Sequence, residues 1–492
     1  MDHRKSLREH IDALRAIGEI QEIDVEVDWN LEIGAIIRRA YERRVAAPLF
    51  NRIQGIEPGF RVLGAPAGVS RVNGLARIAL SLGLPATAGA RQLVEALAAA
   101  HDKPPVPPRR VSDGPCKENK WLGPAVDLER FPAPLIHDGD GGRYLNTWGT
   151  LVVRTPDGQW TNWSITRIML TGKNTMTGLV LPQQHLGMIY SQWKALGRAM
   201  PFALAIGTEP AIPFVSAMPL PDRVNEADFV GAYLGEPVEV VDCETVDLQV
   251  PATSEIVVEG TVSIDQTVRE GPIGEYSGYL HAGRAGPQPV FHVTAVTYRD
   301  QPILPVVASG EPIEENHTCW GLAISAQLLW ELRRRGFPVS GCFCPLETAA
   351  HWLVVTVDQS YRGQAVAERL CRELADIVFH CRAGVLIPQV VLLGDDVDVG
   401  NFEEVAWAIA TRCHPERGRL LFPDEAILPL VGYLTLEEQK KRRAAKVVCH
   451  GLPLDDLPSE QLPRRASFRH GVPPALQEKV LQNWRRYGFG DG

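Results

Sequence analysis

The stretch Trp148–Leu170, WGTLVVRTPDGQWTNWSITRIML, decides how the middle of this chain folds. Two runs rich in β-branched and aromatic residues, Trp148–Arg154 and Trp160–Leu170, flank the sequence TPDG at 155–158. Pro and Gly at these positions favour a tight turn between antiparallel strands. We therefore predict a β-hairpin here.

The pattern of short strands continues outward from this hairpin as far as residue 307. Two helical patterns, 187–199 and 226–234, interrupt it. The further strand-like runs are 202–207, 238–241, 256–264, 290–298 and 302–307. Many strands with few helical crossovers favour a barrel or a sandwich over a doubly wound parallel sheet.

The 492 residues exceed one domain of roughly 100–200 residues, so several domains are expected. The Pro-rich segment KPPVPPRR at 103–110 ends an N-terminal region of amphipathic helices, and after residue 312 helices and strands alternate. We predict an α+β multidomain fold with these parts: an α/β N-terminal region (1–117), a β-rich domain (118–310), an α/β domain (311–465) and a tail helix (466–492).

Two segments near the end of the chain differ in pattern. The segment Leu434–Ser467 is polar and is predicted to be irregular. The tail from Pro474 to Tyr487 is predicted to be helical with an apolar stripe, formed by Leu476, Val480, Trp484 and Tyr487. Such a stripe must dock, either on the rest of the chain or on a partner subunit.

Composition excludes several classes of protein. The net charge of -9, from 50 Lys and Arg against 59 Asp and Glu, disfavours a nucleic-acid-binding surface. No apolar stretch approaches the ~18 residues that a membrane span needs, and the N-terminus lacks an apolar signal core. The nine cysteines contain no C-x-x-C pair, so we expect reduced thiols in a cytoplasmic protein.

The sequence TNWSITR (161–167) places an amide, a hydroxyl and a guanidinium on one predicted strand. Oxygens of Asn162 and Ser164 suit a hard cation or a phosphate, whereas Arg167 suits a carboxylate. Asn162 and Arg167 have opposite parity, so they can serve one site only if the strand bulges or ends between them. The alternative is an ordinary strand with an exposed Arg.

His185 and Glu226 each stand at a predicted helix start. Either residue could simply stabilise the helix end, or it could bind a ligand. With Asn162 they form a mixed oxygen and nitrogen set that suits Mn²⁺ or Mg²⁺ better than Zn²⁺. A second acidic group is expected to cap a helix rather than bind metal: Asp395, Asp396 and Asp398.

The loop EGPIGE (270–275) places two carboxylates on a glycine-rich turn. Glu270 or Glu275 could bind Arg167 and stay ionised. The other carboxyl, in an apolar pocket without a cation, would have a raised pKa and could deliver a proton. The alternative is a solvated acidic loop.

Eight segments, in order along nearly the whole chain, resemble the UbiD-like decarboxylases, which use prenylated FMN. The segments are TNWSITR (161–167), QQHLG (183–187), MPLPDRVNEADFVG (218–231), VPATSEIVVEG (250–260), EGPIGE (270–275), ENHT (315–318), LLGDDVDV (392–399) and TRCHP (411–415). The resemblance implies a split β-barrel like that of flavin reductases in the middle domain. It also implies a homodimer or higher oligomer joined through the tail helix, and a flavin prenyltransferase that supplies the cofactor.

The same resemblance implies the ligands of the cofactor. Mn²⁺, or Mg²⁺, would anchor the cofactor phosphate through Asn162, His185 and Glu226. Backbone oxygens near Trp163 and Met218 would hold K⁺, and Arg382 would lie near the phosphate. The residues implied to line the cofactor are Asn162, Trp163, Ser164, Ile165, Thr166, Arg167 and Gln184.

The implied reaction is the reversible, non-oxidative decarboxylation of an α,β-unsaturated, aromatic or heteroaromatic acid. Arg167 would orient the substrate carboxylate with Glu270 as its partner, and Glu275 would protonate the carbon that lost CO₂. Asn316 and Trp320 would face the substrate. This pair resembles the pyrrole-2-carboxylate subgroup, in which a polar side chain meets a ring heteroatom.

Two other readings remain open. A split-barrel flavin reductase would use FMN as a redox carrier, but hydride transfer needs neither Arg167 nor the two glutamates of the 270–275 loop. A non-catalytic flavin-binding subunit would be expected to lack one of these three residues.

Overall fold

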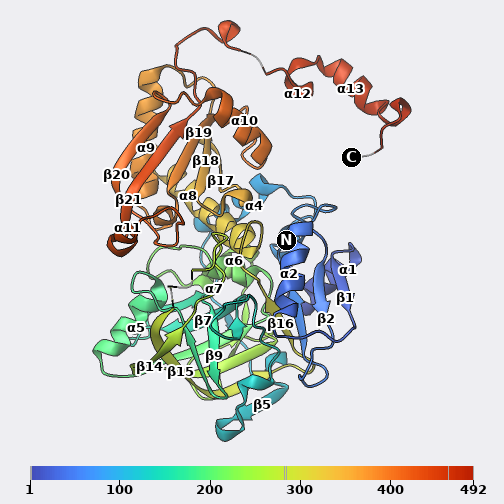
Figure 1. Ribbon diagram of the computed structural model, residues 1–492, viewed down its shortest axis with the longest axis vertical. Coiled ribbons are helices and arrows are strands. Elements are labelled where there is room, and N and C mark those ends of the chain that lie inside the picture. Colours follow the sequence, from blue (N-terminus) through green and yellow to red (C-terminus); the bar gives the residue numbers. More distant parts are fainter. Residues whose placement is uncertain (1–2, 282, 284, 464, 491–492) are drawn as a thin grey trace.

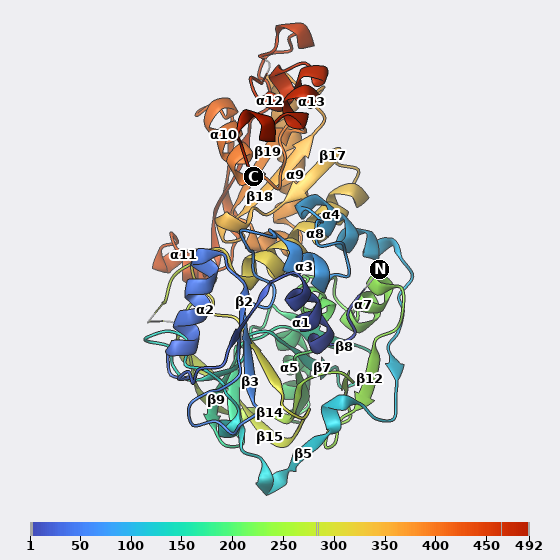
Figure 2. The ribbon, with the colours of Figure 1, turned by 90° about the vertical axis from the view of Figure 1, so that its right-hand side faces the viewer.

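The computed structural model describes residues 3–281, 283, 285–463 and 465–490. The described chain forms four β-sheets with helices packed around them. Figure 1 and Figure 2 show the C-terminal sheet at one end of the long axis and a curled, half-barrel sheet at the other. The predicted mixture of helices and sheets in several layers is confirmed.

The N-terminal region is a small α/β unit, as predicted. Its sheet has the order β1-β2-β3-β16, so that a strand predicted to belong to the middle domain instead completes the N-terminal sheet. The strands are β1 (Ile20–Ile23), β2 (Ala47–Phe50), β3 (Arg61–Gly64) and β16 (Ile303–Val306). The helices are α1 (Leu7–Ala16), α2 (Glu32–Arg43), α3 (Ala76–Ser81) and α4 (Ala90–Ala98).

The middle domain is built on the curled sheet, in the order β6-β9-β10-β15-β14-β11-β7-β8, with β5 (Asn119–Leu122) paired to β15. The predicted hairpin is confirmed, since β7 and β8 pair in antiparallel fashion around the 155–158 turn. The strands are β6 (Tyr144–Asn146), β7 (Gly149–Arg154), β8 (Thr161–Ser164), β9 (Ile168–Gly172), β10 (Thr175–Gly178), β11 (Met200–Ile206), β14 (Ile256–Glu270) and β15 (Gly286–Tyr298).

Three helices accompany the curled sheet, and two of them begin at residues singled out above. They are α5 (His185–Ala195), α6 (Ala211–Ser216) and α7 (Glu226–Leu234). A three-stranded sheet lies outside it, made of β13 (Gln249–Pro251), β12 (Glu239–Asp242) and β4 (Arg109–Arg110).

The C-terminal domain is an α/β sheet in the order β17-β18-β19-β21-β20. A π-helical turn, Asn316–Gly321, leads into its first helix. The strands are β17 (Val339–Phe343), β18 (Trp352–Val357), β19 (Gln389–Gly394), β20 (Arg419–Ala426) and β21 (Arg443–His450). The helices are α8 (Leu322–Arg334), α9 (Gln364–Phe379), α10 (Phe402–Arg412) and α11 (Leu436–Lys441).

One prediction for this domain was wrong. The segment 434–467, predicted to be irregular, contains α11 and the internal strand β21, which pairs in parallel with β19 and in antiparallel fashion with β20. Lys446 in β21 is nevertheless buried, because its ammonium donates to the Gly384 carbonyl oxygen at 2.7 Å. A polar sequence can therefore occupy an internal strand when its polar groups are bonded.

The tail extends away from the C-terminal sheet (Figure 1). It contains α12 (Phe468–Gly471) and α13 (Pro474–Gln482), and α13 has no buried residue. Leu476, Leu481 and Trp484 are between 39% and 63% exposed, so an apolar face is left uncovered here. None of the helices in the described residues is long and apolar enough to cross a membrane.

Candidate active site

Strand β8 lies at the edge of the curled sheet, and this position brings the first group of candidate residues together. Its outward N–H groups have no neighbouring strand, so side chains of the α7 N-terminus accept them. The amide N–H of Thr161 donates to Asn225 Oδ1 at 3.0 Å, and that of Trp163 donates to Glu226 Oε2 at 2.8 Å. The start of α7 is thereby held against the strand that carries Asn162.

The three predicted metal ligands converge, although 64 residues separate the first from the last. Asn162 Nδ2 donates to Glu226 Oε1 at 2.8 Å and lies 3.5 Å from His185 Nδ1. His185 Nδ1 is 3.7 Å from Glu226 Oε1. All three side chains are buried. Sequence alone could not establish this proximity.

The cluster fits a hard divalent cation. Asn162 Oδ1 is buried and has no hydrogen-bond partner among the described residues, an expensive state for an amide oxygen. A half turn about the Cβ–Cγ bond exchanges Oδ1 with Nδ2 and directs the oxygen at His185 and Glu226. Within the described chain no group of three or more His, Cys, Asp or Glu side chains forms a metal site, so the Asn oxygen is needed to complete this one.

Asp222 joins the cluster to the C-terminal domain. Its Oδ1 lies 3.0 Å from His185 Nε2 and accepts from Arg382 Nη1 at 2.9 Å. Burial lowers the pKa of Arg382, and the Asp222 carboxylate opposes that shift. A carboxylate on one imidazole nitrogen directs the other nitrogen toward a metal. Asp222 was missed by sequence analysis, because no spacing rule distinguishes it within the 218–231 segment.

The predicted strand from Trp160 to Leu170 breaks after Ser164, and the chain resumes as β9 at Ile168. The break is stabilised by the buried Asn146, whose Nδ2 donates to the Thr166 carbonyl oxygen at 2.7 Å. Asn162 and Arg167 could serve one site only if the strand bulged or ended between them, and the strand does end there. Asn162 lies on the strand, and Arg167 lies beyond its end and faces a different set of partners.

Arg167 is held between both glutamates of the 270–275 loop. Its Nε and Nη2 donate to Glu270 Oε1 and Oε2 at 2.9 and 3.0 Å, and its Nη1 donates to Glu275 Oε1 at 2.5 Å. Tyr144, another residue that sequence analysis missed, donates to Glu270 Oε1 at 3.0 Å. Although burial opposes it, the two carboxylates raise the pKa of Arg167, so the guanidinium stays charged.

This arrangement corrects one expectation. Glu275 was expected in an apolar pocket without a cation, but it shares the Arg167 guanidinium with Glu270. Both carboxylates are buried, so the alternative of a solvated acidic loop is excluded. One guanidinium has five N–H donors in a fork, enough to bind two carboxylates at once.

The glutamate loop is braced by the segment 137–141. The Gly274 N–H donates to Asp140 Oδ1 at 3.1 Å, and the Gly141 N–H donates to the Pro272 carbonyl oxygen at 2.7 Å. A Cβ on Gly141 would lie 2.1 Å from the Gly271 carbonyl oxygen. Only glycine permits this backbone approach, which places Glu275 beside Arg167.

The predicted substrate residues lie against the glutamate loop. His317 Nε2 is 2.8 Å from the carbonyl oxygen of Tyr276, the residue after Glu275. The rings of Tyr276 and Trp320 meet edge to face, with centroids 4.9 Å apart. Asn316 begins the same π-helical turn. The structure therefore places Trp320 against the residue that follows Glu275, and Asn316 lies in the same turn as Trp320.

The remaining cofactor candidates occupy the same region. Trp163 and Thr166 are buried, Ile165 donates its N–H to the Ser216 carbonyl oxygen at 3.3 Å, and Gln184 caps α5 in an exposed position. Ser164 Oγ is a second buried polar atom without a hydrogen-bond partner in the described residues. A polar ligand next to this strand could form the hydrogen bonds or metal contacts that the Asn162 and Ser164 oxygens lack.

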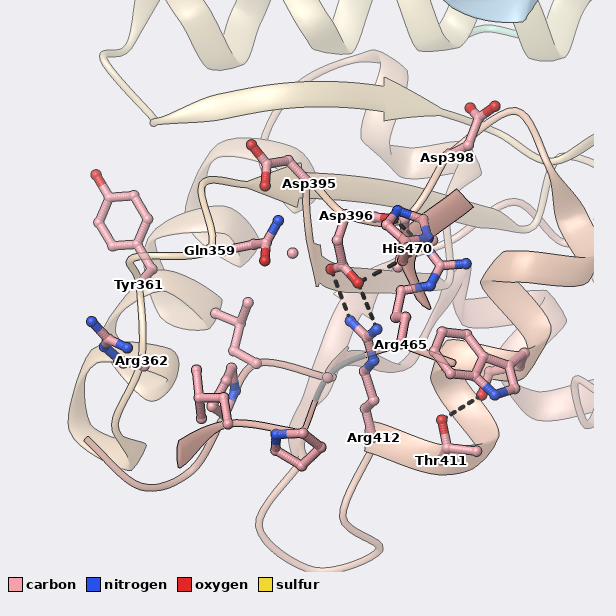
Figure 3. Close-up of a pocket in the computed structure, with 18 of the residues that line it drawn as sticks. Gln359, Tyr361, Arg362, Asp395, Asp396, Asp398, Thr411, Arg412, Arg465 and His470 are labelled. Carbon is pink, nitrogen blue, oxygen red and sulfur yellow. Dashed lines mark hydrogen bonds and ion pairs between the residues drawn. The ribbon is translucent and has the colours of Figure 1, made fainter. Parts of the chain in front are cut away.

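A cavity of about 1230 Å³ in the C-terminal domain is lined by residues that follow β18, β19 and β21 (Figure 3). Its acidic residues do not cap α10, contrary to the prediction, because Asn401 does so. Asp396 instead binds Arg412 through two hydrogen bonds of 2.6 and 2.9 Å, and the Arg465 guanidinium donates to the Asp396 carbonyl oxygen. These contacts tie α10 and the residue before the tail to the loop that follows β19.

Comparison with protein families gives three matches in chain order. Residues 11–97, 109–312 and 317–450 match the N-terminal, Rift-related and C-terminal domains of 3-octaprenyl-4-hydroxybenzoate carboxy-lyase, the UbiD family. Together these matches cover most of the chain.

Curated relatives and solved structures agree with these matches. The chain is 47% identical to the pyrrole-2-carboxylic acid decarboxylase of Pseudomonas aeruginosa and 39% identical to ferulic acid decarboxylase 1 of Saccharomyces cerevisiae, each over 98% of both chains. The UbiD-class enzyme HmfF from Pelotomaculum thermopropionicum, solved with FMN, has a TM-score of 0.83 at 30% identity and aligns over 97% of this chain and 100% of its own. An evolved dimeric form of HmfF, solved with prFMN (prenylated FMN), gives 0.80 at 29% identity, over 98% and 100%.

Proposed function

This chain belongs to the UbiD family of carboxy-lyases, and from that premise we propose that it is a prenylated-FMN-dependent decarboxylase of an aromatic or heteroaromatic acid. The observation that carries the proposal is the partly buried guanidinium of Arg167, which lies between the buried carboxylates of Glu270 and Glu275. A cation that binds the substrate carboxylate, next to an acid that donates a proton, is what a decarboxylase needs to replace CO₂ with a proton.

The residues that would hold the cofactor come from two domains. Asn162, His185 and Glu226 would bind Mn²⁺ or Mg²⁺, and Arg382 would meet the phosphate. The divalent ion would neutralise phosphate charge on a chain of net charge -9. Ser164, Thr166 and Gln184 would line the isoalloxazine, and backbone oxygens near Trp163 and Met218 would hold K⁺. When bound, prenylated FMN would supply an electron sink for the electrons of the broken C–C bond.

Arg167 would bind the substrate carboxylate. Glu270 accepts from the Nε and Nη2 donors and is itself hydrogen-bonded by Tyr144, so it would align the guanidinium. The single contact to Glu275 at Nη1 is the one that a substrate carboxylate would displace. Substrate binding would thereby release Glu275 from its cation.

Glu275 would then act as the proton donor. Once released from Arg167, its carboxylate would take up a proton from water and hold it for transfer to the substrate carbon. The bond between the ring carbon and the carboxylate breaks, CO₂ leaves, and the Glu275 proton takes its place on that carbon. The reverse sequence carboxylates the same carbon, so the reaction would be reversible.

The substrate would be a conjugated ring acid. Asn316 and Trp320 would contact its ring, since Trp320 packs on Tyr276 next to the proton donor. The relatives named for pyrrole-2-carboxylic acid and ferulic acid support this class. A flavin reductase is not favoured, because hydride transfer gives the Arg167 cluster no role.

The assembly would include a second copy of the chain. The exposed face of α13 would dock on that copy, and the curled sheet would correspond to the split barrel of flavin reductases. A flavin prenyltransferase would supply the cofactor. The functional test is to co-express the chain with such a transferase and to measure CO₂ release from a panel of conjugated acids. NAD(P)H oxidation without CO₂ release would refute the proposal in favour of the reductase.

A further inference from the structure

The side-chain amide of Asn316 is held in one orientation by a buried carboxylate. Its Nδ2 lies 3.1 Å from both Glu314 Oε1 and Oε2 and donates to Ser309 Oγ at 2.9 Å. The backbone N–H of Asn316 also donates to Glu314 Oε2, at 2.8 Å. Glu314 is fully buried, whereas Asn316 is only partly buried.

An ionised carboxylate can only accept hydrogen bonds, so it must face the nitrogen end of the amide. The oxygen end, Asn316 Oδ1, receives no hydrogen bond from any described residue and is left as an acceptor. Exchanging the two ends would set the amide oxygen against the Glu314 carboxylate, an arrangement of two acceptors without a proton between them.

Glu314 is itself kept in place by His317. The Glu314 N–H donates to His317 Nδ1 at 3.0 Å, so Nδ1 is the bare nitrogen of this imidazole and Nε2–H donates to the Tyr276 carbonyl oxygen. Nδ1, 3.4 Å from Glu314 Oε1, thus offers no proton that would compete with Asn316 for the carboxylate. Burial lowers the pKa of His317 to about 4, which keeps the ring neutral.

We propose that Glu314 is a positioning residue that fixes Asn316 as a hydrogen-bond acceptor, so that the site selects ring acids with an N–H donor next to the carboxylate-bearing carbon. The inference rests on the proposed function, because it requires Asn316 to face the substrate ring. It adds to that function which partner donates the hydrogen bond between Asn316 and the ring, and which residue determines that direction.

The test compares two five-membered ring acids that differ at the heteroatom, pyrrole-2-carboxylate with an N–H donor and furan-2-carboxylate with a ring oxygen. The proteins are the cofactor-loaded wild type, Glu314→Gln and the matched control Glu315→Gln. The control removes an equally buried carboxylate whose partners are Tyr41 and the Ala67 N–H rather than Asn316. The glutamine at 314 can donate to Asn316 Oδ1, which permits the amide to turn.

In the wild type we expect pyrrole-2-carboxylate to bind more tightly. In Glu314→Gln its KM should rise about tenfold, the scale of one hydrogen bond, with little change in kcat, because the contact is present before the chemical step. KM for furan-2-carboxylate should stay constant or fall. Glu315→Gln should retain the wild-type preference.

Calorimetric titration of both acids into all three proteins keeps the inference testable without turnover. Equal affinity of the wild type for the two acids, or an identical loss of preference in both variants, would overturn it. A third outcome separates the two proposals. If the wild type turns over neither acid, but still binds pyrrole-2-carboxylate more tightly and loses this difference in Glu314→Gln, the proposed function is refuted and the role of Glu314 is supported.

Discussion

Nη1 of Arg167 lies 2.5 Å from Oε1 of Glu275, and Glu270 binds another edge of the same guanidinium, formed by Nε and Nη2. The attachment with a single hydrogen bond belongs to Glu275, which is proposed above as the proton donor. A single charge-assisted contact is easier to exchange for a substrate carboxylate than a two-bond fork. The asymmetry therefore supports the proposal that Glu270 aligns Arg167 and that Glu275 donates the proton.

Replacing Glu275 by Gln should leave cofactor binding intact and reduce kcat at least about a hundredfold, because an amide cannot supply the proton. The measurement is CO₂ release by protein whose flavin absorbance and melting temperature equal those of the wild type. Turnover within a few-fold of wild type would exclude Glu275 as the donor.

Replacing Glu270 by Gln should act differently, because Glu270 aligns Arg167 without transferring the proton. We expect KM for the acid to rise more than kcat falls, since the guanidinium loses its two-bond partner while Tyr144 keeps its own contact to the side chain. Steady-state kinetics on the loaded enzyme would detect this. A pure kcat effect would assign Glu270 to the chemical step.

Replacing His185 by Ala should yield protein with little bound Mn²⁺ and little flavin absorbance, because one of three ligands and the contact to Asp222 are lost. Elemental analysis of the purified protein gives the metal content. His380→Ala is the matched control, since that side chain is 59% exposed and its polar contacts among the described residues are to Asp376 and Glu425 of the C-terminal domain. Full metal occupancy in His185→Ala would refute the proposal that Asn162, His185 and Glu226 bind the metal.

Replacing Asp222 by Ala should weaken Mn²⁺ binding by about 10–100-fold without abolishing it, because the imidazole loses the carboxylate that orients it. Titration of metal-depleted protein with Mn²⁺ measures this effect independently of turnover. Asp222→Asn retains an acceptor for His185 Nε2 and should recover most of the affinity. Equal affinities for all three proteins would limit Asp222 to a surface contact.

The preference for a ring N–H should depend on pH. Burial raises the pKa of Glu314 to about 7, although the Asn316 donors and the charges of Arg38 and His137 oppose the shift. Above pH 7 the ionised carboxylate holds the Asn316 amide. Below it the neutral acid can donate to Oδ1, so the preference should decline as pH falls. The wild-type ratio of KM values between pH 5.5 and 8.5 measures this.

Two variants show which glutamate causes the pH dependence of the substrate preference. Burial also raises the pKa of Glu315 to about 7, so both glutamates titrate in the same range. The pH dependence should vanish in Glu314→Gln and persist in Glu315→Gln. His317 is neutral throughout this range, because its pKa lies near 4. A profile that disappears only in Glu315→Gln would contradict the assignment.

Sequence reasoning worked best where the signal is local. The 155–158 hairpin and the bounds of α7 follow from turn chemistry and periodicity over a few residues, whereas α5 begins two residues earlier than predicted. It failed for β21, because a strand that carries Arg443 and Lys446 within a polar segment resembles a solvated region until its bonding partners are known. It also failed for Asp396, whose partners Arg412 and Arg465 lie 16 and 69 residues away.

By itself, the sequence determined which groups could take part in chemistry: an amide, an imidazole and a carboxylate suited to a hard cation, and a guanidinium with two acids. Only the tertiary structure decided their pairing. The end of β8 at Ser164 turns Arg167 away from Asn162, and the edge position of β8 draws in Glu226 through an unpaired backbone N–H. The reason is physical. Side-chain identity is a local property. The hydrogen bonds that a sheet edge requires, and the balance of charge around a partly buried guanidinium, arise only when distant segments come together and exclude water.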